Sequence, residues 1–84
     1  MRNGKCCEEA LKIDPQYGNA WRNLGIVGGG SVNGTAYSSK QCYEEALKID
    51  PQYGDAWHNL GFAGGGSVNG TAHSSKQCYM YEEA

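Results

Sequence analysis

Residues 42–61 read CYEEALKIDPQYGDAWHNLG, and residues 6–25 read CCEEALKIDPQYGNAWRNLG. The two stretches belong to a duplication with a period of 36 residues, because residues 6–41 and 42–77 differ at only six of 36 positions. In order, the differing pairs are Cys7/Tyr43, Asn19/Asp55, Arg22/His58, Ile26/Phe62, Val27/Ala63 and Tyr37/His73. A period of this length is typical of helical solenoids, whose units pack on their neighbours.

The spacing of apolar residues predicts two helices in each repeat. Ala20, Trp21 and Leu24 share one face of a helix over 18–27, and the three glycines that follow end it. A capping box formed by Ser38 and Gln41 starts the next helix. The chain as a whole is predicted to contain helices over 6–13, 18–27, 38–49, 54–63 and 74–84.

No alternating strand pattern is visible, and residues 31–35 have the composition of a turn. Glu44 and Glu45 are expected to face water. The predicted fold class is therefore all-α, a short α-solenoid of antiparallel helix pairs. Residues 1–84 form a single repeat domain, with a half repeat over 6–17, a repeat over 18–53 and a truncated repeat over 54–84.

The motif Ala20-Trp21-x-Asn23-Leu24-Gly25, followed by Tyr43-x-x-Ala46-Leu47-x-x-Asp50-Pro51, resembles the tetratricopeptide repeat. That family has a period of about 34 residues, and two extra residues lie in the turn here. Sel1-like repeats are relatives that lengthen the same turn with glycines and a valine, as in Gly30-Ser31-Val32.

The resemblance implies a concave face, lined by the first helix of each repeat, that binds a peptide or protein. Three of the six differences between the repeats map to this face, as expected of a surface free to vary, although drift at exposed positions explains them equally well. The partner-binding residues implied in this way are Asn19, Arg22, Ile26, Asp55, His58 and Phe62.

Neither end of the predicted stack has the polar cap that terminal repeats need. We therefore expect head-to-tail association of copies into an oligomer or filament, the most favoured function, through Cys6, Leu11, Ile13, Cys78, Tyr79, Met80 and Tyr81. The alternatives are an intracellular adaptor that binds a peptide on the concave face, and a fragment whose ends a longer parent covers.

The composition excludes several other classes of function. A net charge of −2 gives no broad basic face for nucleic acid, and no apolar run is long enough to span a membrane. The spacing from Gly29 to Gly34 suggests a phosphate loop, but Thr35 stands where the lysine is required. The cysteines lack the spacing of metal ligands, and no catalytic constellation is visible, so we expect a non-enzymatic protein without cofactor or metal.

Asn33-Gly34-Thr35 and Asn69-Gly70-Thr71 are candidate sites of N-glycosylation. An exported, glycosylated fibre subunit is therefore a further alternative. Reduced thiols and the absence of a basic-then-apolar leader favour the cytoplasm, but the compartment stays open.

Overall fold

A computed structural model of the chain describes residues 3–83, except for the side chains of residues 3, 4, 79 and 81–83. Within this range all five predicted helices are present, and the first begins three residues earlier than predicted. Their bounds are α1 Asn3–Ile13, α2 Gly18–Ile26, α3 Ser39–Ile49, α4 Gly54–Phe62 and α5 Ser75–Glu83.

The prediction of an all-α fold is wrong, because a β-hairpin joins the two helices of each repeat. β1 (Gly30–Val32) pairs antiparallel with β2 (Thr35–Tyr37), and β3 (Gly66–Val68) pairs in the same register with β4 (Thr71–His73). The described part of the chain is thus a mixed α/β structure of five helices and two hairpins.

The turn of each hairpin explains both its formation and why it was missed. Asn33 and Gly34 have φ of 50° and 86°. Positive φ at both central residues is the geometry of the type I′ turn, whose twist suits a two-residue hairpin. The strands of three residues are too short to show an alternating pattern. Asn-Gly between Val32 and Thr35 was the available signal.

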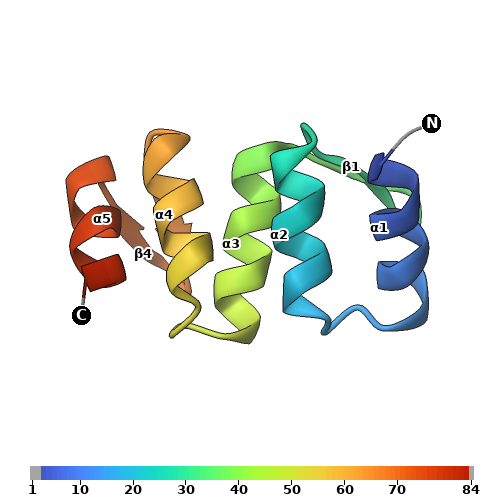
Figure 1. The fold of residues 1–84 in the computed structure, drawn as a ribbon, viewed down its shortest axis with the longest axis horizontal. Coiled ribbons are helices and arrows are strands. Elements are labelled where there is room, and N and C mark those ends of the chain that lie inside the picture. Colours follow the sequence, from blue (N-terminus) through green and yellow to red (C-terminus); the bar gives the residue numbers. More distant parts are fainter. Residues whose placement is uncertain (1–2, 84) are drawn as a thin grey trace.

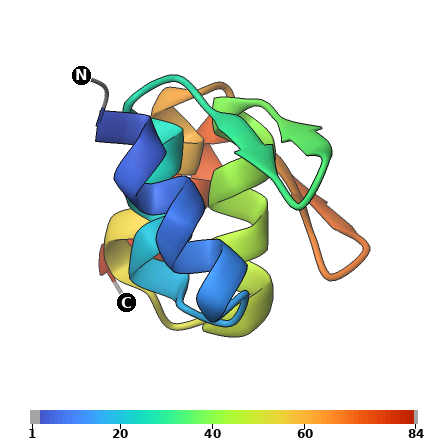
Figure 2. The ribbon, with the colours of Figure 1, turned by 90° about the vertical axis from the view of Figure 1, so that its right-hand side faces the viewer.

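The helices stack in chain order, each packing on the next, in a molecule of 33 × 20 × 19 Å (Figure 1). α2 and α4 lie on one side of the stack and also contact each other. Figure 2 shows the two hairpins on the opposite side, beyond α3. The side formed by α2 and α4 is called the α2–α4 face below.

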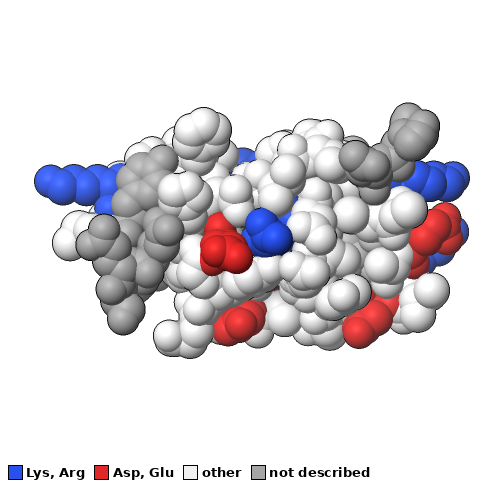
Figure 3. Space-filling view, viewed as in Figure 1, with Lys and Arg blue, Asp and Glu red and all other residues white. Residues whose placement is uncertain are grey.

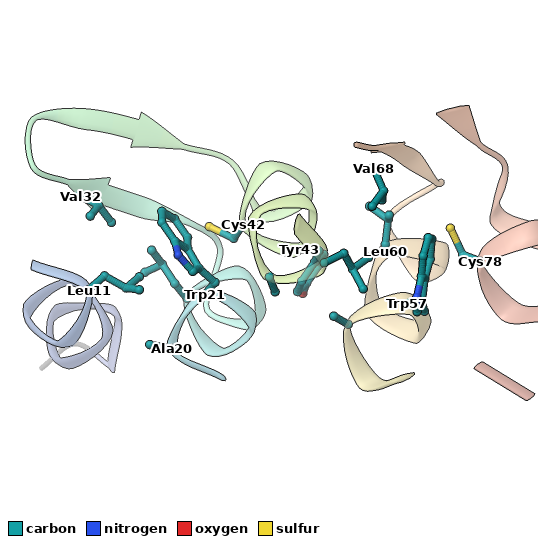
Figure 4. Packing of buried hydrophobic residues seen from close by; sticks show 14 residues of the cluster. Leu11, Ala20, Trp21, Val32, Cys42, Tyr43, Trp57, Leu60, Val68 and Cys78 are labelled. Atoms are coloured by element: carbon teal, nitrogen blue, oxygen red, sulfur yellow. The ribbon is translucent and has the colours of Figure 1, made fainter. Parts of the chain in front are cut away.

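A single apolar core runs along the stack (Figure 4). The indole of Trp21 donates a 2.8 Å hydrogen bond to the carbonyl of Pro15, and Trp57 donates one of 2.7 Å to Pro51. Each buried indole N–H therefore has a partner, as burial requires. The buried apolar side chains of this core are Leu11, Ala20, Trp21, Leu24, Val32, Cys42, Tyr43, Ala46, Leu47, Ala56, Trp57, Leu60, Val68 and Cys78.

The predicted signals at the helix ends are confirmed. The Ser38 side chain accepts from the amide of Gln41, whose side chain accepts from the Ser38 amide, which completes the capping box. α2 ends at Ile26, and Gly28 and Gly29 beyond it take positive φ. The amide of Gly29 donates a 2.8 Å hydrogen bond to Leu24 O.

One acidic residue in each repeat has a role that the sequence did not indicate. Glu44 was expected to face water, but its Oε2 accepts a 2.8 Å hydrogen bond from the amide of Ser67 in β3. Glu8 accepts from Ser31 in β1 at the same distance. A Cβ on Gly66 would collide with the Glu44 carboxylate, so the third glycine of each triplet allows the helix to hold the hairpin.

Candidate functional site

The predicted partner-binding residues all lie on the two helices of the α2–α4 face. Asn19, Arg22 and Ile26 come from α2, and Asp55, His58 and Phe62 occupy the same positions on α4. Five of the six side chains are exposed, and Arg22 is partly buried. Figure 3 shows this face to carry few charged groups, with one acidic and one basic group side by side near its middle.

Tyr53, the residue before α4, joins two of these side chains. Its hydroxyl donates a 2.8 Å hydrogen bond to Asn19 Oδ1 and accepts one of 2.9 Å from Arg22 Nε. The guanidinium carbon of Arg22 also lies 5.9 Å from the centre of the tyrosine ring, within cation–π range. Tyr53 therefore fixes Asn19 and Arg22 against the next repeat. Our sequence reasoning missed it, although the tyrosine recurs before each helix of the α2 type.

The apolar part of the α2–α4 face lies at the C-terminal ends of its helices. Phe62 is 83% exposed, and Ile26 and Val27 are 52% and 43% exposed. When a partner covers a phenylalanine this exposed, the free energy of the complex is lowered. This end of the face can therefore bind an apolar side chain.

A second exposed apolar surface lies at the end of α1. Ile13 is 86% exposed and Tyr17 49%. Ile49 and Tyr53, which occupy the same positions 36 residues later, are partly buried and pack against the core. Position within the stack therefore decides their exposure, because α2 covers the end of α3.

The other residues predicted for self-association are divided between the interior and the surface. Leu11 and Cys78 are fully buried within the chain and do not line an end surface. Cys6 is exposed, and Met80 is 63% exposed. Tyr79 and Tyr81 belong to α5, but their side chains lie outside the described part of the chain.

The four cysteines are all free thiols. Burial, with the negative charge of Glu45 as a smaller cause, raises the pKa of Cys42 to about 12. Burial likewise raises the pKa of Cys7 and of Cys78. Because the thiolate is the reactive form, the buried thiols are poor nucleophiles and behave as small apolar side chains.

We also searched the described residues for a metal site and for a membrane-spanning helix. They contain no group of three histidines, cysteines or acids able to hold a metal ion. None of the described helices has the length and apolarity to cross a bilayer. Asn33 and Asn69 are exposed at the hairpin tips, and their glycosylation stays a prediction that an intact-mass measurement would test.

Residues 42–63, which run from the body of α3 to the end of α4, match the family model described as tetratricopeptide repeat. The match supports a tetratricopeptide repeat over this segment. No curated protein and no solved structure matches the chain.

The tetratricopeptide repeat indicates a role in protein–protein interaction, and such repeats are typically non-catalytic modules. The matched segment contains Tyr43 and Tyr53, the two tyrosines through which it packs on α2. It also contains Asp55, His58 and Phe62 of the α2–α4 face. The 36-residue period comes from the duplication itself, and the hairpin occupies the part of the period beyond the matched residues.

Proposed function

We propose that the chain is a non-enzymatic interaction module that associates with copies of itself through the end of α1. The observation that carries this proposal is the exposure of Ile13, 86% against the partial burial of Ile49 at the equivalent position. Covering one isoleucine side chain contributes about 1.5–3 kcal/mol. Repeats of this kind are stabilised by their neighbours, so a further helix against α1 would extend the same packing.

Association of this kind joins unlike surfaces. Contact between the α1 end of one copy and a different surface of the next is heterologous, and it propagates into a ring or a filament. Ile13, Tyr17 and Cys6 supply the exposed surface at one end, and Met80 is exposed at the other. The assembled species should therefore grow with concentration instead of stopping at a dimer.

Sedimentation velocity over a range of concentrations tests the proposal. The unmodified chain should shift to larger species as its concentration rises, and Ile13→Glu should remain monomeric. Ile26→Glu is the matched control, because it places the same charge on an isoleucine that is 52% exposed and belongs to α2 instead of α1. A chain that stays monomeric throughout, or an Ile13→Glu variant that assembles normally, would show the proposal to be wrong.

The exposure of Phe62 favours a second candidate function, the binding of a peptide along the α2–α4 face. An apolar peptide side chain would cover Phe62 and Ile26, while Asp55 and Arg22 would orient polar groups of the peptide. Selection from a displayed peptide library is the test. Ligands of this face should lose affinity for Phe62→Ser and bind Ile13→Glu normally, whereas ligands indifferent to Phe62→Ser would contradict this candidate.

A further inference from the structure

One contact between repeats occurs inside the chain, at the N-terminus of α2. A Cβ on Gly18 would lie 3.9 Å from Ile49 Cγ2 and 4.0 Å from Tyr53 Cδ2. Beside it, the Tyr53 hydroxyl donates to Asn19. Ile49 and Tyr53 therefore fit a site made by a glycine and the polar residue that follows it.

Each half of this contact also recurs elsewhere in the chain, without its counterpart among the described residues. Ile13 and Tyr17, which repeat Ile49 and Tyr53, are largely exposed at the end of α1. Gly54 and Asp55 repeat Gly18 and Asn19 at the start of α4. A Cβ on Gly54 would meet none of the described atoms within 4 Å, and Asp55 is exposed. The chain thus presents equivalents of both sides of its internal contact, Ile13 and Tyr17 on one side and Gly54 and Asp55 on the other.

α5 packs on α4 as α3 packs on α2. The sequence of α5, however, resembles that of α3 less closely than the sequence of α1 does. Ala46 of α3 is fully buried, and its backbone oxygen lies 3.9 Å from where a Cβ on Gly18 would be. α1 keeps an alanine at this position, Ala10, whereas the sequence of α5 places Glu82 there. Residues 6–13 differ from 42–49 only at Cys7. α1 thus retains the sequence that packs against a helix of the α2 type.

We propose that α1 of one copy replaces α5 on α4 of a second copy, which places Ile13 and Tyr17 against Gly54 and Asp55. The inference rests on the proposed self-association and specifies its contact. The Tyr17 hydroxyl would donate to the Asp55 carboxylate, as Tyr53 does to Asn19, and a charged acceptor strengthens such a bond. Each copy keeps both halves of the contact, so the exchanged copies continue one helical stack.

The exchange should be reversible. Cys7 is the equivalent in α1 of Tyr43 in α3, whose ring fills the space beside Gly25. α1 therefore brings less apolar surface to α4 at that point. α5 must also leave its place, which exposes Cys78 from full burial. Ala10 favours α1 on α4, whereas Cys7 and the exposure of Cys78 favour α5. Neither helix is favoured at every position, so we expect assembly to depend on protein concentration.

Alkylation of the native thiols tests the exchange in the unmodified chain. Cys78 should react at least about tenfold faster at concentrations where sedimentation shows assembly, because a change of about 1.4 kcal/mol in its protection has that effect. Cys42 is the internal control, since α3 keeps it fully buried in both arrangements. Tyr17→Phe should weaken association about tenfold or more, as loss of a hydrogen bond to a charged acceptor does.

Cross-linking tests the position of the contact. A mixture of the Ile13→Cys and Gly54→Cys variants, each with a different isotopic label, should form a disulfide between the introduced thiols under mild oxidation. In the internal contact, a Cβ on Gly18 would lie 3.9 Å from Ile49 Cγ2, so the equivalent pair of side chains lies close together. Gly34→Cys, at the tip of the first hairpin, replaces Gly54→Cys as the matched control and should not link. Mass spectrometry of the linked peptides identifies the pair.

The outcomes separate the two proposals. A chain that remains monomeric at every concentration overturns the self-association and the exchange together. Assembly in which Cys78 stays protected and no link joins positions 13 and 54 overturns the exchange and leaves self-association standing. Assembly with reactive Cys78 and a 13–54 link supports both.

Discussion

The ring of Tyr43 on α3 fills the space that a side chain on Gly25 of α2 would need. A Cβ on Gly25 would lie 2.5 Å from Tyr43 Cε1, and both residues are buried. The glycine of the Leu-Gly pair is thus required by the close approach of two helices.

Gly25→Ala should therefore destabilise the chain by about 1–3 kcal/mol, the usual cost of overpacking a core. Urea unfolding measures the change. Gly54→Ala is the matched control, because its Cβ would meet nothing among the described residues, and it should be neutral or slightly stabilising. Equal effects of the two substitutions would contradict the packing argument.

Tyr53→Phe tests the cluster that joins the repeats. The substitution removes the hydroxyl that bonds Asn19 and Arg22, and we expect a loss of about 1–2 kcal/mol in the free energy of unfolding. Tyr17→Phe changes the same group at the exposed equivalent position. At concentrations where the chain is monomeric, Tyr17→Phe should leave stability unchanged, and a matching loss there would argue against the inter-repeat role of Tyr53.

Glu44→Ala tests the attachment of the hairpin to the helix. Loss of the 2.8 Å bond from the amide of Ser67 should cost about 1–3 kcal/mol, as expected for a hydrogen bond to a charged group. Hydrogen exchange at that amide should accelerate. Glu45→Ala is the control, because it removes the exposed pair with Lys48. It should lower the free energy of unfolding by a few tenths of a kcal/mol at most, and the Ser67 amide should remain protected from hydrogen exchange.

The buried thiol of Cys42 predicts a loss of stability in alkali. Its pKa is raised from 9.0 to about 12 by burial, so above pH 9 the unfolded chain releases a proton that the folded chain retains. The contribution is fully present below pH 9 and falls by about 1.4 kcal/mol per pH unit between pH 9 and pH 12. In urea unfolding, the stability of the chain relative to Cys42→Ala should be constant below pH 9 and decline above it. Parallel curves of stability against pH for the chain and for Cys42→Ala would contradict this prediction.

Local patterns in the sequence predicted the helices well. Apolar residues at helical spacing, the capping box at Ser38 and the glycines after α2 each act within a few residues, so their meaning does not depend on distant parts of the chain. The hairpins escaped because their three-residue strands carry too little pattern. Only the Asn33-Gly34 dipeptide marked them, and it was interpreted as a turn alone.

The structure divides the residues of the candidate surfaces between the exterior and the interior of the chain. Exposure of Ile26, Phe62 and Ile13 agrees with a role on the surface, but Leu11 and Cys78 proved to be interior. The sequence places such residues on a helix face without showing which neighbour covers that face. Tyr53 was missed for the same reason, since its partners lie 31 and 34 residues away in the chain.

By itself, the sequence determined the repeat, its helices and its likeness to a tetratricopeptide repeat, because periodicity and capping are short-range properties of the chain. Only the tertiary structure decided that Ile49 is covered while Ile13 is exposed, and that Glu44 holds a hairpin while Glu45 pairs with Lys48. Nearly identical stretches of sequence acquire different surroundings according to their place in the stack, and burial and hydrogen bonding depend on those surroundings.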